Sequence, residues 1–289
     1  MSYVCDVCPR RCSVPRGLGF CGMGENPVVA RAAPHFDEEP AISGTRGSGT
    51  VFFAGCSLKC VFCQNVEISH GRFGKEISVE RLTAIYHELA DKGVHNINLV
   101  NPSHWANEIL KSLEGFHRLP VVWNSGGYDR AETIARMEGR ISIYLPDLKY
   151  VDPELSRRYS GAADYFAFAG PALREMLRQT GPARLDADGI MVSGTIIRHL
   201  ILPGRAEESK RVLDWIGENL PGAWVSLMAQ YMPVGDVAGL DELERRVMRD
   251  EYEEVLEHMF DIGLGDGYAQ ELESSDGKYV PPFDLTGID

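Results

Sequence analysis

Three cysteines within eight residues are the first feature of this sequence that can do chemistry. Cys56, Cys60 and Cys63 stand at C-x3-C-x2-C spacing, directly after the apolar residues 51–54. Soft thiolates at this spacing suit three corners of a 4Fe–4S cluster. Three ligands leave the fourth iron with an open coordination position, whereas a structural zinc site uses four closed ligands. The loop therefore predicts an iron–sulfur cluster that binds a further molecule, rather than three cysteines buried in a core.

A second group of four cysteines lies near the N-terminus: Cys5, Cys8, Cys12 and Cys21. Their C-x2-C-x3-C-x8-C spacing supplies a closed four-thiolate site. Three ligands close together resemble an iron–sulfur loop more than the paired knuckles of a zinc ribbon, so a second iron–sulfur cluster is slightly favoured and zinc is the alternative. A segment of about thirty residues buries too little core to fold alone, so the metal would supply much of its folding energy.

The bulk composition narrows the class of protein. Seven cysteines, an odd number in two tight groups, favour metal binding over a disulfide framework. A formal charge of −13 argues against a nucleic-acid partner, because phosphates need a cationic face. The sequence has no apolar run of about 18 residues and no basic-then-apolar export signal. We therefore expect a cytoplasmic protein with no membrane-spanning segment.

From about residue 50, strands alternate with helices. Strands are expected at residues 51–54, 96–100, 120–124, 141–145, 195–202 and 223–229. Helices are expected at residues 78–92, 103–114, from Asp129, from Asp152, and at 162–179, 206–219 and 241–262, with a kink or a break at Pro171. Repeated strand–helix units predict an α/β fold with a parallel sheet and right-handed crossovers. Six strands are fewer than the eight of a closed barrel, so we predict a partial (β/α)6 TIM-like barrel, with a doubly wound sheet as the alternative.

The predicted organisation has four parts. Residues 1–33 form a small cysteine-rich metal-binding module, and residues 34–49, with two prolines and a glycine-rich stretch, form a linker. Residues 50–270 form the partial barrel, and residues 271–289 form a C-terminal tail.

Charged side chains lie in or directly after two of the predicted strands. Asp147 and Lys149 come after residues 141–145, and Arg198 lies in the strand at 195–202. Barrel ligands bind at the carboxyl ends of strands, where Asp147 can accept ribose hydroxyls and either cation can neutralise a carboxylate. The alternative is an ion pair that only stabilises the rim of the barrel. Two histidines, His104 and His199, are interpreted as packing or rim residues.

The C-x3-C-x2-C loop, with Phe62 before its last cysteine, resembles the signature of the radical S-adenosylmethionine (SAM) superfamily. The resemblance implies a partial barrel in which the open iron binds the amino and carboxylate groups of SAM. It further implies that an electron from the cluster splits SAM into methionine and a 5′-deoxyadenosyl radical, which removes hydrogen from a substrate.

Within that superfamily, residues 50–235 are most similar to pyruvate formate-lyase activating enzymes and their uncharacterised iron–sulfur relatives. The motifs that carry the similarity are Asn124-Ser-Gly-Gly-Tyr128, Pro146-Asp-Leu-Lys-Tyr150, Arg198-His-Leu-Ile-Leu-Pro-Gly204 and Ala229-Gln-Tyr231. The resemblance implies that SAM contacts come from Asn124, Ser125, Asp147, Lys149, Arg198 and Gln230. Activating enzymes bind the SAM amino group with a Gly-Gly-Glu stretch; this chain has Asn101-Pro-Ser-His-Trp105, so Asn101 and Ser103 are expected to substitute as oxygen acceptors.

The sequence thus predicts a radical SAM oxidoreductase with a 4Fe–4S cluster, SAM and a second metal site. The resemblance implies reduced flavodoxin or ferredoxin as electron donor, and a glycyl radical enzyme as a protein substrate whose backbone glycine loses hydrogen. Two alternatives stay open: a radical SAM tailoring enzyme acting on a small molecule or peptide, and a non-catalytic iron–sulfur electron carrier. Neither fold nor cofactor identifies the substrate.

Overall fold

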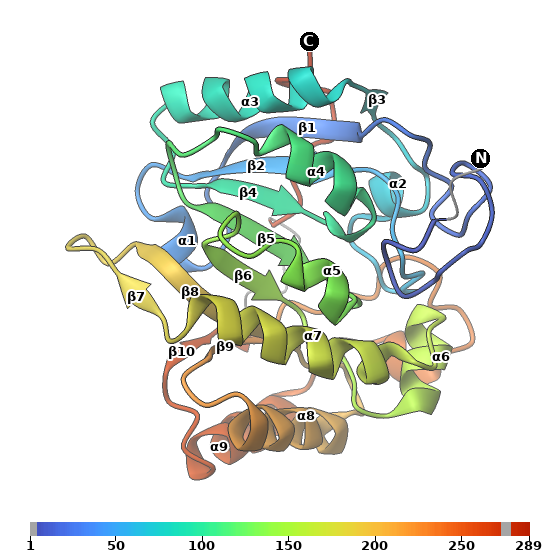
Figure 1. The fold of residues 1–289 in the computed structure, drawn as a ribbon. Helices are drawn as coiled ribbons and strands as arrows, with labels where there is room; N and C mark the ends of the chain where they lie inside the picture. Colours follow the sequence, from blue (N-terminus) through green and yellow to red (C-terminus); the bar gives the residue numbers. More distant parts are fainter. Residues whose placement is uncertain (1–4, 273–278) are drawn as a thin grey trace.

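A single ten-stranded sheet organises the computed structural model, which describes residues 5–272 and 279–289 (Figure 1). The strands are β1 (Val28–His35), β2 (Ser48–Phe53), β3 (Lys75–Glu76), β4 (Ile97–Val100), β5 (Val121–Ser125), β6 (Ile143–Pro146), β7 (Arg184–Leu185), β8 (Met191–Leu200), β9 (Trp224–Met228) and β10 (Gly267–Ala269). Neighbouring strands run parallel in the order β2-β4-β5-β6-β8-β9-β10. Antiparallel pairs join β1 to β2, β3 to β1 and β7 to β8.

Helices connect the parallel strands. They are α1 (Pro40–Ser43), α2 (Val66–Ser69), α3 (Val79–Asp91), α4 (Ala106–Ser112), α5 (Ala131–Ala135), α6 (Pro153–Ser160), α7 (Tyr165–Thr180), α8 (Ala206–Asn219) and α9 (Arg249–Asp261), with 3₁₀ turns η1 (Ser103–Trp105) and η2 (Asp241–Leu243). In Figure 1, α3, α4, α5 and α7 follow one another down the same face of the sheet.

The six expected strands are confirmed as β2, β4, β5, β6, β8 and β9. They are neighbours in chain order, whereas the order of a doubly wound sheet reverses at a switch point. The observed order agrees with the predicted (β/α)6 connectivity and does not fit the doubly wound alternative.

The two faces of the sheet differ in character. In β4, Ile97 and Leu99 are fully buried in the apolar cluster formed with α3, α4 and α5. Their neighbours Asn98 and Val100 lie on the opposite, inner face, because successive side chains of a strand alternate. Part of this inner face is covered by α1, whose Ile42 packs in a cluster with residues of β5, β6 and β8. The inner face therefore combines an apolar layer beside α1 with polar side chains next to it.

The structure corrects the predicted linker and tail. Residues 34–49, predicted as a loop, include the end of β1, all of α1 and the start of β2. Strand β1 belongs to the main sheet because it pairs antiparallel with β2. In the predicted tail, the described residues 279–289 pack on the sheet: the Ala32 N–H donates to the carbonyl of Thr286 at 2.8 Å, and Ile288 is 1% exposed.

Three helix predictions also needed correction. Asp129 does not cap α5, because its buried carboxylate accepts a hydrogen bond from Ser125 Oγ at 2.6 Å. Helix α7 continues through Pro171, whose flanking turns are buried in the core. The long helix expected at 241–262 is divided into η2 and α9, because Glu251 accepts the Met248 N–H at 2.8 Å and starts α9 there.

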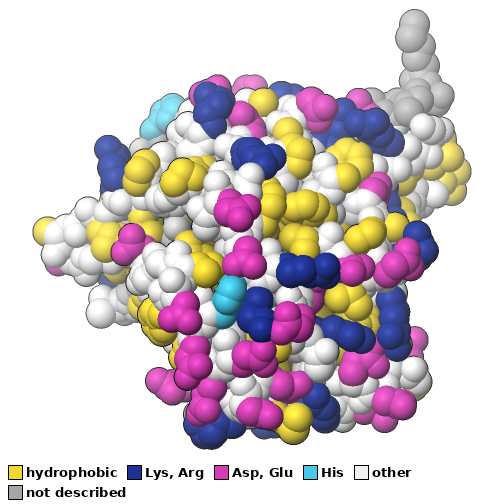
Figure 2. Space-filling model, turned by 90° about the horizontal axis from the view of Figure 1, so that it is seen from below, with side chains coloured by type: hydrophobic (Ala, Val, Ile, Leu, Met, Phe, Trp, Pro, Cys, Tyr) yellow, Lys and Arg dark blue, Asp and Glu magenta, His cyan; other side chains and the backbone are white. Residues whose placement is uncertain are grey.

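The surface carries charges of both signs. Figure 2 shows Asp and Glu side chains interspersed with Lys and Arg over the face where α8 and α9 lie. An example is Lys210 on α8, which pairs with Glu254 on α9 at 2.7 Å. Within residues 5–272 and 279–289, no helix has the length and hydropathy needed to cross a membrane.

Gly127, in the turn after β5, positions the end of β6, and replacing it tests this close approach. Its φ is +76°, and a Cβ there would overlap the carbonyl oxygen of Asp147. Gly127→Ala should therefore lower the free energy of unfolding by about 3 kcal/mol, from left-handed strain plus overpacking. Gly93 has a φ of +79° with nothing within 4 Å of an added Cβ, so Gly93→Ala should lose only about 1 kcal/mol. Denaturant unfolding followed by circular dichroism compares the two, and equal losses would contradict the predicted clash.

Candidate active site

A cavity of about 510 Å³ lies at the carboxyl ends of the parallel strands. Each of the six central strands contributes to its wall, at or just beyond its end: Phe52, Val100, Asn124, Asp147, Arg198 and Met228. Cys60 and Cys63 form another part of the wall, and the segment before α1 a further part. This is the end of an α/β sheet where ligands bind, and the cavity size is typical of a small-molecule site.

The cysteine loop follows β2 and is fixed against α6. The Lys59 N–H donates to the Ser160 carbonyl at 3.1 Å, and the Val61 N–H donates to the Tyr159 carbonyl at 2.9 Å. Phe62 is buried and packs edge-on against Tyr231, with ring centroids 5.9 Å apart. The sequence between the cysteines therefore anchors the loop and leaves two of the thiols at the cavity.

Hydrogen-bond donors surround the three sulfurs. Cys56 Sγ accepts the Leu58 N–H at 3.3 Å, Cys60 Sγ lies 3.0 Å from Ser160 Oγ, and Cys63 Sγ lies 3.2 Å from Ser69 Oγ. Burial raises the pKa of Cys56 to about 12, with Cys60 adding to the effect, and burial also raises the pKa of Cys60. Metal binding replaces these protons, and hydrogen bonds to the sulfurs tune the reduction potential of an iron–sulfur cluster.

This donor set fits an iron–sulfur cluster. In the described part of the chain, no three His, Cys, Asp or Glu side chains converge as the ligands of one ion would. In a four-iron cluster each thiolate binds a different iron, so the sulfurs need not meet at one point.

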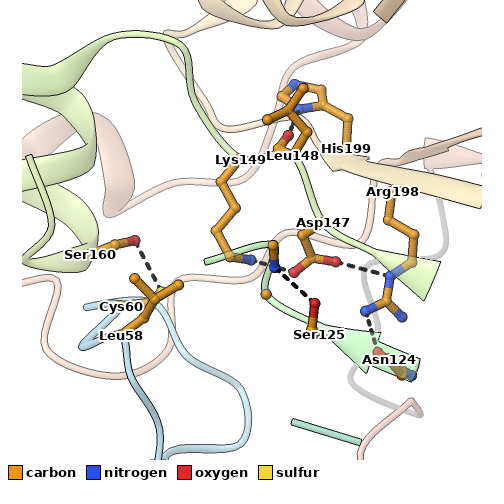
Figure 3. Close-up of polar contacts among 12 residues, drawn as sticks. Leu58, Cys60, Asn124, Ser125, Asp147, Leu148, Lys149, Ser160, Arg198 and His199 are labelled. Carbon is orange, nitrogen blue, oxygen red and sulfur yellow. Dashed lines mark hydrogen bonds and ion pairs between the residues drawn. The ribbon is translucent and has the colours of Figure 1, made fainter. Parts of the chain in front are cut away.

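A partly buried ion-pair network lies beside the loop (Figure 3). Asp147 Oδ2 is 2.5 Å from Lys149 Nζ, and its Oδ1 accepts Arg198 Nε–H at 2.9 Å. Arg198 Nη2 also donates to Asn124 Oδ1 at 2.6 Å. Burial alone would raise the pKa of Asp147, but Lys149 and Arg198 hold it below its ordinary value. The three charged residues thus pair with one another, as the rim alternative predicted, while all of them line the cavity.

Lys149 connects this network to the cysteine loop. Burial lowers the pKa of Lys149, but Asp147 and, to a smaller extent, Cys60 raise it above its ordinary value. The ammonium group therefore stays charged. An ammonium has three donor directions and one is directed to Asp147. Lys149 is therefore placed to serve a second anionic group at the cysteine loop.

Two carboxylates that the sequence analysis missed also line the cavity: Glu38 and Glu39. Glu38 Oε1 accepts from the amides of Asn98 and Asn124, each at 3.1 Å, and its Oε2 is 3.4 Å from Arg198. Both glutamates lie in the predicted linker. Three consecutive acidic residues, Asp37 to Glu39, between an apolar strand and Pro40 were the available signal for them.

Of the other predicted SAM contacts, some line the cavity and some do not. Gln230 lines the cavity, and its Oε1 accepts from Gln270 Nε2 at 2.9 Å. Asn101 does not line it; its Nδ2 donates to the Gly55 carbonyl, directly before Cys56. Ser103 and Ser125 do not line it either, and both hydrogen-bond the buried Asp129. Ser125 is on the helix-covered face because it alternates with Asn124 along β5.

The four N-terminal cysteines lie around one small second cavity. Cys8 is close enough to the other three for their charges to interact, and burial raises its pKa to about 12. All seven cysteines of the chain are free of disulfides, as predicted. Four thiols are the number of donors that a closed metal site uses, although in the described structure they line this cavity without converging as the ligands of one ion would.

The N-terminal segment, residues 5–27, packs directly on the sheet domain. Arg10 Nε donates to the Ser57 carbonyl at 2.7 Å, next to Cys56. Arg16 donates to the His104 carbonyl at 2.7 Å and pairs with Glu108 at 3.2 Å. The second cysteine group is therefore adjacent to the loop of the first.

Both histidines are packing residues, as predicted. His104 Nε2 donates to the Ala54 carbonyl at 2.8 Å, and His199 Nδ1 donates to the Leu148 carbonyl at 2.7 Å. Burial lowers the pKa of each to about 4, so both are neutral near pH 7.

Comparison with known proteins supports the cluster and the fold. Residues 43–144 match a family described as a 4Fe-4S single cluster domain, a range that contains Cys56, Cys60 and Cys63 but none of the N-terminal cysteines. Over 265 residues the chain is 31% identical to the uncharacterized protein MJ0674 of Methanocaldococcus jannaschii, covering 88% of this chain and 73% of that protein.

Among solved structures, the chain is similar to SuiB of Streptococcus suis, with a TM-score of 0.50, 15% identity, and 75% of this chain aligned to 47% of SuiB. SuiB bound to S-adenosylmethionine aligns with a TM-score of 0.49 and 13% identity, over 79% of this chain and 48% of that one. The chain spans about half the length of SuiB. At this identity the likeness shows a shared fold, in agreement with the α/β fold implied by the radical SAM resemblance.

Replacing Asp147 tests the ion-pair network. Asp147→Asn leaves Lys149 and Arg198 buried without their shared carboxylate, so the free energy of unfolding should fall by about 3–5 kcal/mol. The exposed pair of Glu154 and Arg157, 3.0 Å apart, provides the control, and Glu154→Gln should cost at most about 1 kcal/mol. Denaturant titration measures both; a small loss for Asp147→Asn would show that the network is not a stabilising unit.

Metal analysis tests the N-terminal cysteines. Cys5→Ala/Cys8→Ala should lose one metal site and keep the iron of the other, because the two groups use separate thiols. Eight iron atoms per wild-type chain would indicate two 4Fe–4S clusters, and four iron with one zinc would indicate the alternative. If the iron and zinc contents of the variant equal those of the wild type, the prediction of a second metal site is wrong.

Proposed function

The chain belongs to the family of the uncharacterized protein MJ0674, and for this chain we propose the activity of a radical SAM enzyme. The observation that carries the proposal is the arrangement of the cavity: two cysteines of a three-thiol loop form its wall, beside Asp147, Lys149 and Arg198. A three-ligand cluster needs a cavity beside its open iron, and this loop has one. An electron carrier has no need of such a cavity, so the arrangement favours catalysis.

In this proposal Cys56, Cys60 and Cys63 hold a 4Fe–4S cluster. Such a cluster, when reduced, supplies the electron that splits bound SAM into methionine and a 5′-deoxyadenosyl radical. The chain's own residues bind SAM and orient it. Lys149, with donor capacity left after pairing with Asp147, is assigned to the SAM carboxylate, and Gln230 and Asn124 supply polar contacts. The buried aromatic pair of Phe62 and Tyr231 excludes water from the loop.

The finer assignments rest on sequence resemblance. The similarity to pyruvate formate-lyase activating enzymes supports a glycyl radical enzyme as substrate, with reduced flavodoxin or ferredoxin as donor in the cytoplasm. The second candidate is a tailoring enzyme for a small molecule or peptide, favoured by the carboxylates that line the cavity, of which Glu39 is buried. The four N-terminal cysteines are assigned to a second metal site, either an iron–sulfur cluster or zinc.

SAM cleavage tests the proposed function. Anaerobically reconstituted protein with dithionite and SAM should release 5′-deoxyadenosine, measured by chromatography. Cys56→Ala, Cys60→Ala and Cys63→Ala should each reduce the release to background, because the cluster loses one of only three ligands. Cys5→Ala/Cys8→Ala, which alters the other cysteine group, should still release it. Release that persists in the three single variants would refute the assignment of the loop.

A further inference from the structure

The charges that line the cavity do not balance. Its carboxylates are Asp37, Glu38, Glu39 and Asp147, and its permanent cations are Lys149 and Arg198. Both cations are already paired with Asp147. His35 also lines the cavity, but burial lowers its pKa, so it adds no positive charge near pH 7. Burial raises the pKa of Glu38 and of Glu39, and Arg198 opposes the rise at both, so the wall holds two carboxyl groups whose charge is only partly compensated.

Glu39 is the buried carboxyl group of this wall, and Arg198 is the charge that most opposes the effect of its burial. This residue is 9% exposed, and it forms no ion pair with any residue in the described ranges. One carboxylate oxygen is hydrogen-bonded to Ser226. The other, Oε2, is buried and has no hydrogen-bond partner within residues 5–272 and 279–289. A buried carboxylate oxygen without a partner costs stability, so a ligand that supplies the missing donor gains that energy on binding.

A purely structural role does not explain Glu39. It occupies the N-cap position of α1, yet its side chain makes no capping hydrogen bond, and the next residue, Pro40, has no N–H to offer. Tyr268, beside it at the cavity, accepts the Ala41 N–H at its hydroxyl oxygen at 3.2 Å. This tyrosine also brings an aromatic ring to that part of the wall. A carboxylate beside an aromatic ring is an arrangement that binds organic cations.

Glu39 and the cysteine loop belong to different parts of the cavity wall. Glu39 directly precedes α1, whereas Cys60 and Cys63 follow β2. Lys149 lies near Cys60 and Arg198 lies near Glu39, and Asp147 pairs with both cations.

We propose that Glu39, with Glu38 beside it, binds an ammonium group of the substrate at the end of the cavity that α1 covers. The proposal rests on the proposed function in that SAM occupies the end beside the cysteines. Glu39 is then a specificity-determining residue that selects amines over neutral compounds of the same shape.

The test uses benzylammonium as the probe and benzyl alcohol as its neutral counterpart of similar size. Both are titrated into the anaerobic, reconstituted protein with SAM, and binding is measured by calorimetry. Wild type should bind benzylammonium at least about tenfold more tightly than benzyl alcohol. Glu39→Gln, which keeps the side-chain size, should abolish this preference and leave benzyl alcohol binding as it was. Glu114→Gln, an exposed glutamate outside the cavity, should keep the preference.

Each other outcome decides against the proposal. Equal affinity of wild type for the two probes overturns it, whether or not the variant folds. Retention of the preference in Glu39→Gln overturns the assignment of the residue. If Glu39→Gln weakens SAM binding as much as it weakens benzylammonium binding, the carboxylate belongs to the SAM site and the proposal is overturned. Failure of the proposed function gives a different result from failure of this proposal. In that case the wild type releases no 5′-deoxyadenosine but still prefers benzylammonium.

Discussion

The carboxylate of Asp147 can stay ionised inside the protein only because two cations share it. Its pairs with Lys149 and Arg198 join residues that follow or belong to β6 and β8, although 51 positions separate Asp147 from Arg198. The backbone reinforces the same junction, since the Leu148 N–H donates to the Arg198 carbonyl at 2.9 Å. Burial of an unpaired charge costs several kcal/mol, so any displacement of one strand relative to the other carries that penalty. The electrostatic requirement of one side chain thereby fixes the geometry of the cavity wall.

The same requirement orders the cavity from one end to the other. Lys149 can face the cysteine loop because Asp147 keeps it charged, and Arg198 can extend toward Glu38 because its Nε is held by Asp147. Anionic and cationic groups alternate along the wall, and the series ends in a carboxylate that lacks a cation of its own. A protein selected for stability alone would neutralise Glu39 or replace it, whereas binding sites commonly keep such uncompensated groups.

The sequence predicted the parts of the site that depend on local patterns. Cysteine spacing located the loop, and the predicted strands located Asp147 and Arg198, because strand periodicity is visible in a single segment. Asn124 came from the family resemblance. The sequence did not predict which side of a strand end faces the cavity, so Ser125 was grouped with Asn124 although the two alternate. Strand β1 and the residues that follow it were missed for a different reason. Their structure depends on pairing with β2 and on α1 covering the inner face of the sheet, and these are tertiary contacts that no local pattern encodes.

Charged side chains also hold the N-terminal segment on the sheet domain. Arg10 and Arg16 donate to carbonyls of Ser57 and His104, at the two loops that follow β2 and β4, and Glu108 pairs with Arg16. These contacts join residues that are far apart in the sequence. The guanidinium groups of Arg10 and Arg16 therefore hold the N-terminal segment, with its four cysteines, next to Cys56. A metal bound by the four cysteines would order the arginines between them, and through Arg10 it would order the backbone of the adjacent loop at Ser57. The two cysteine groups therefore lie side by side through Arg10 and Ser57, while each group supplies its own thiols.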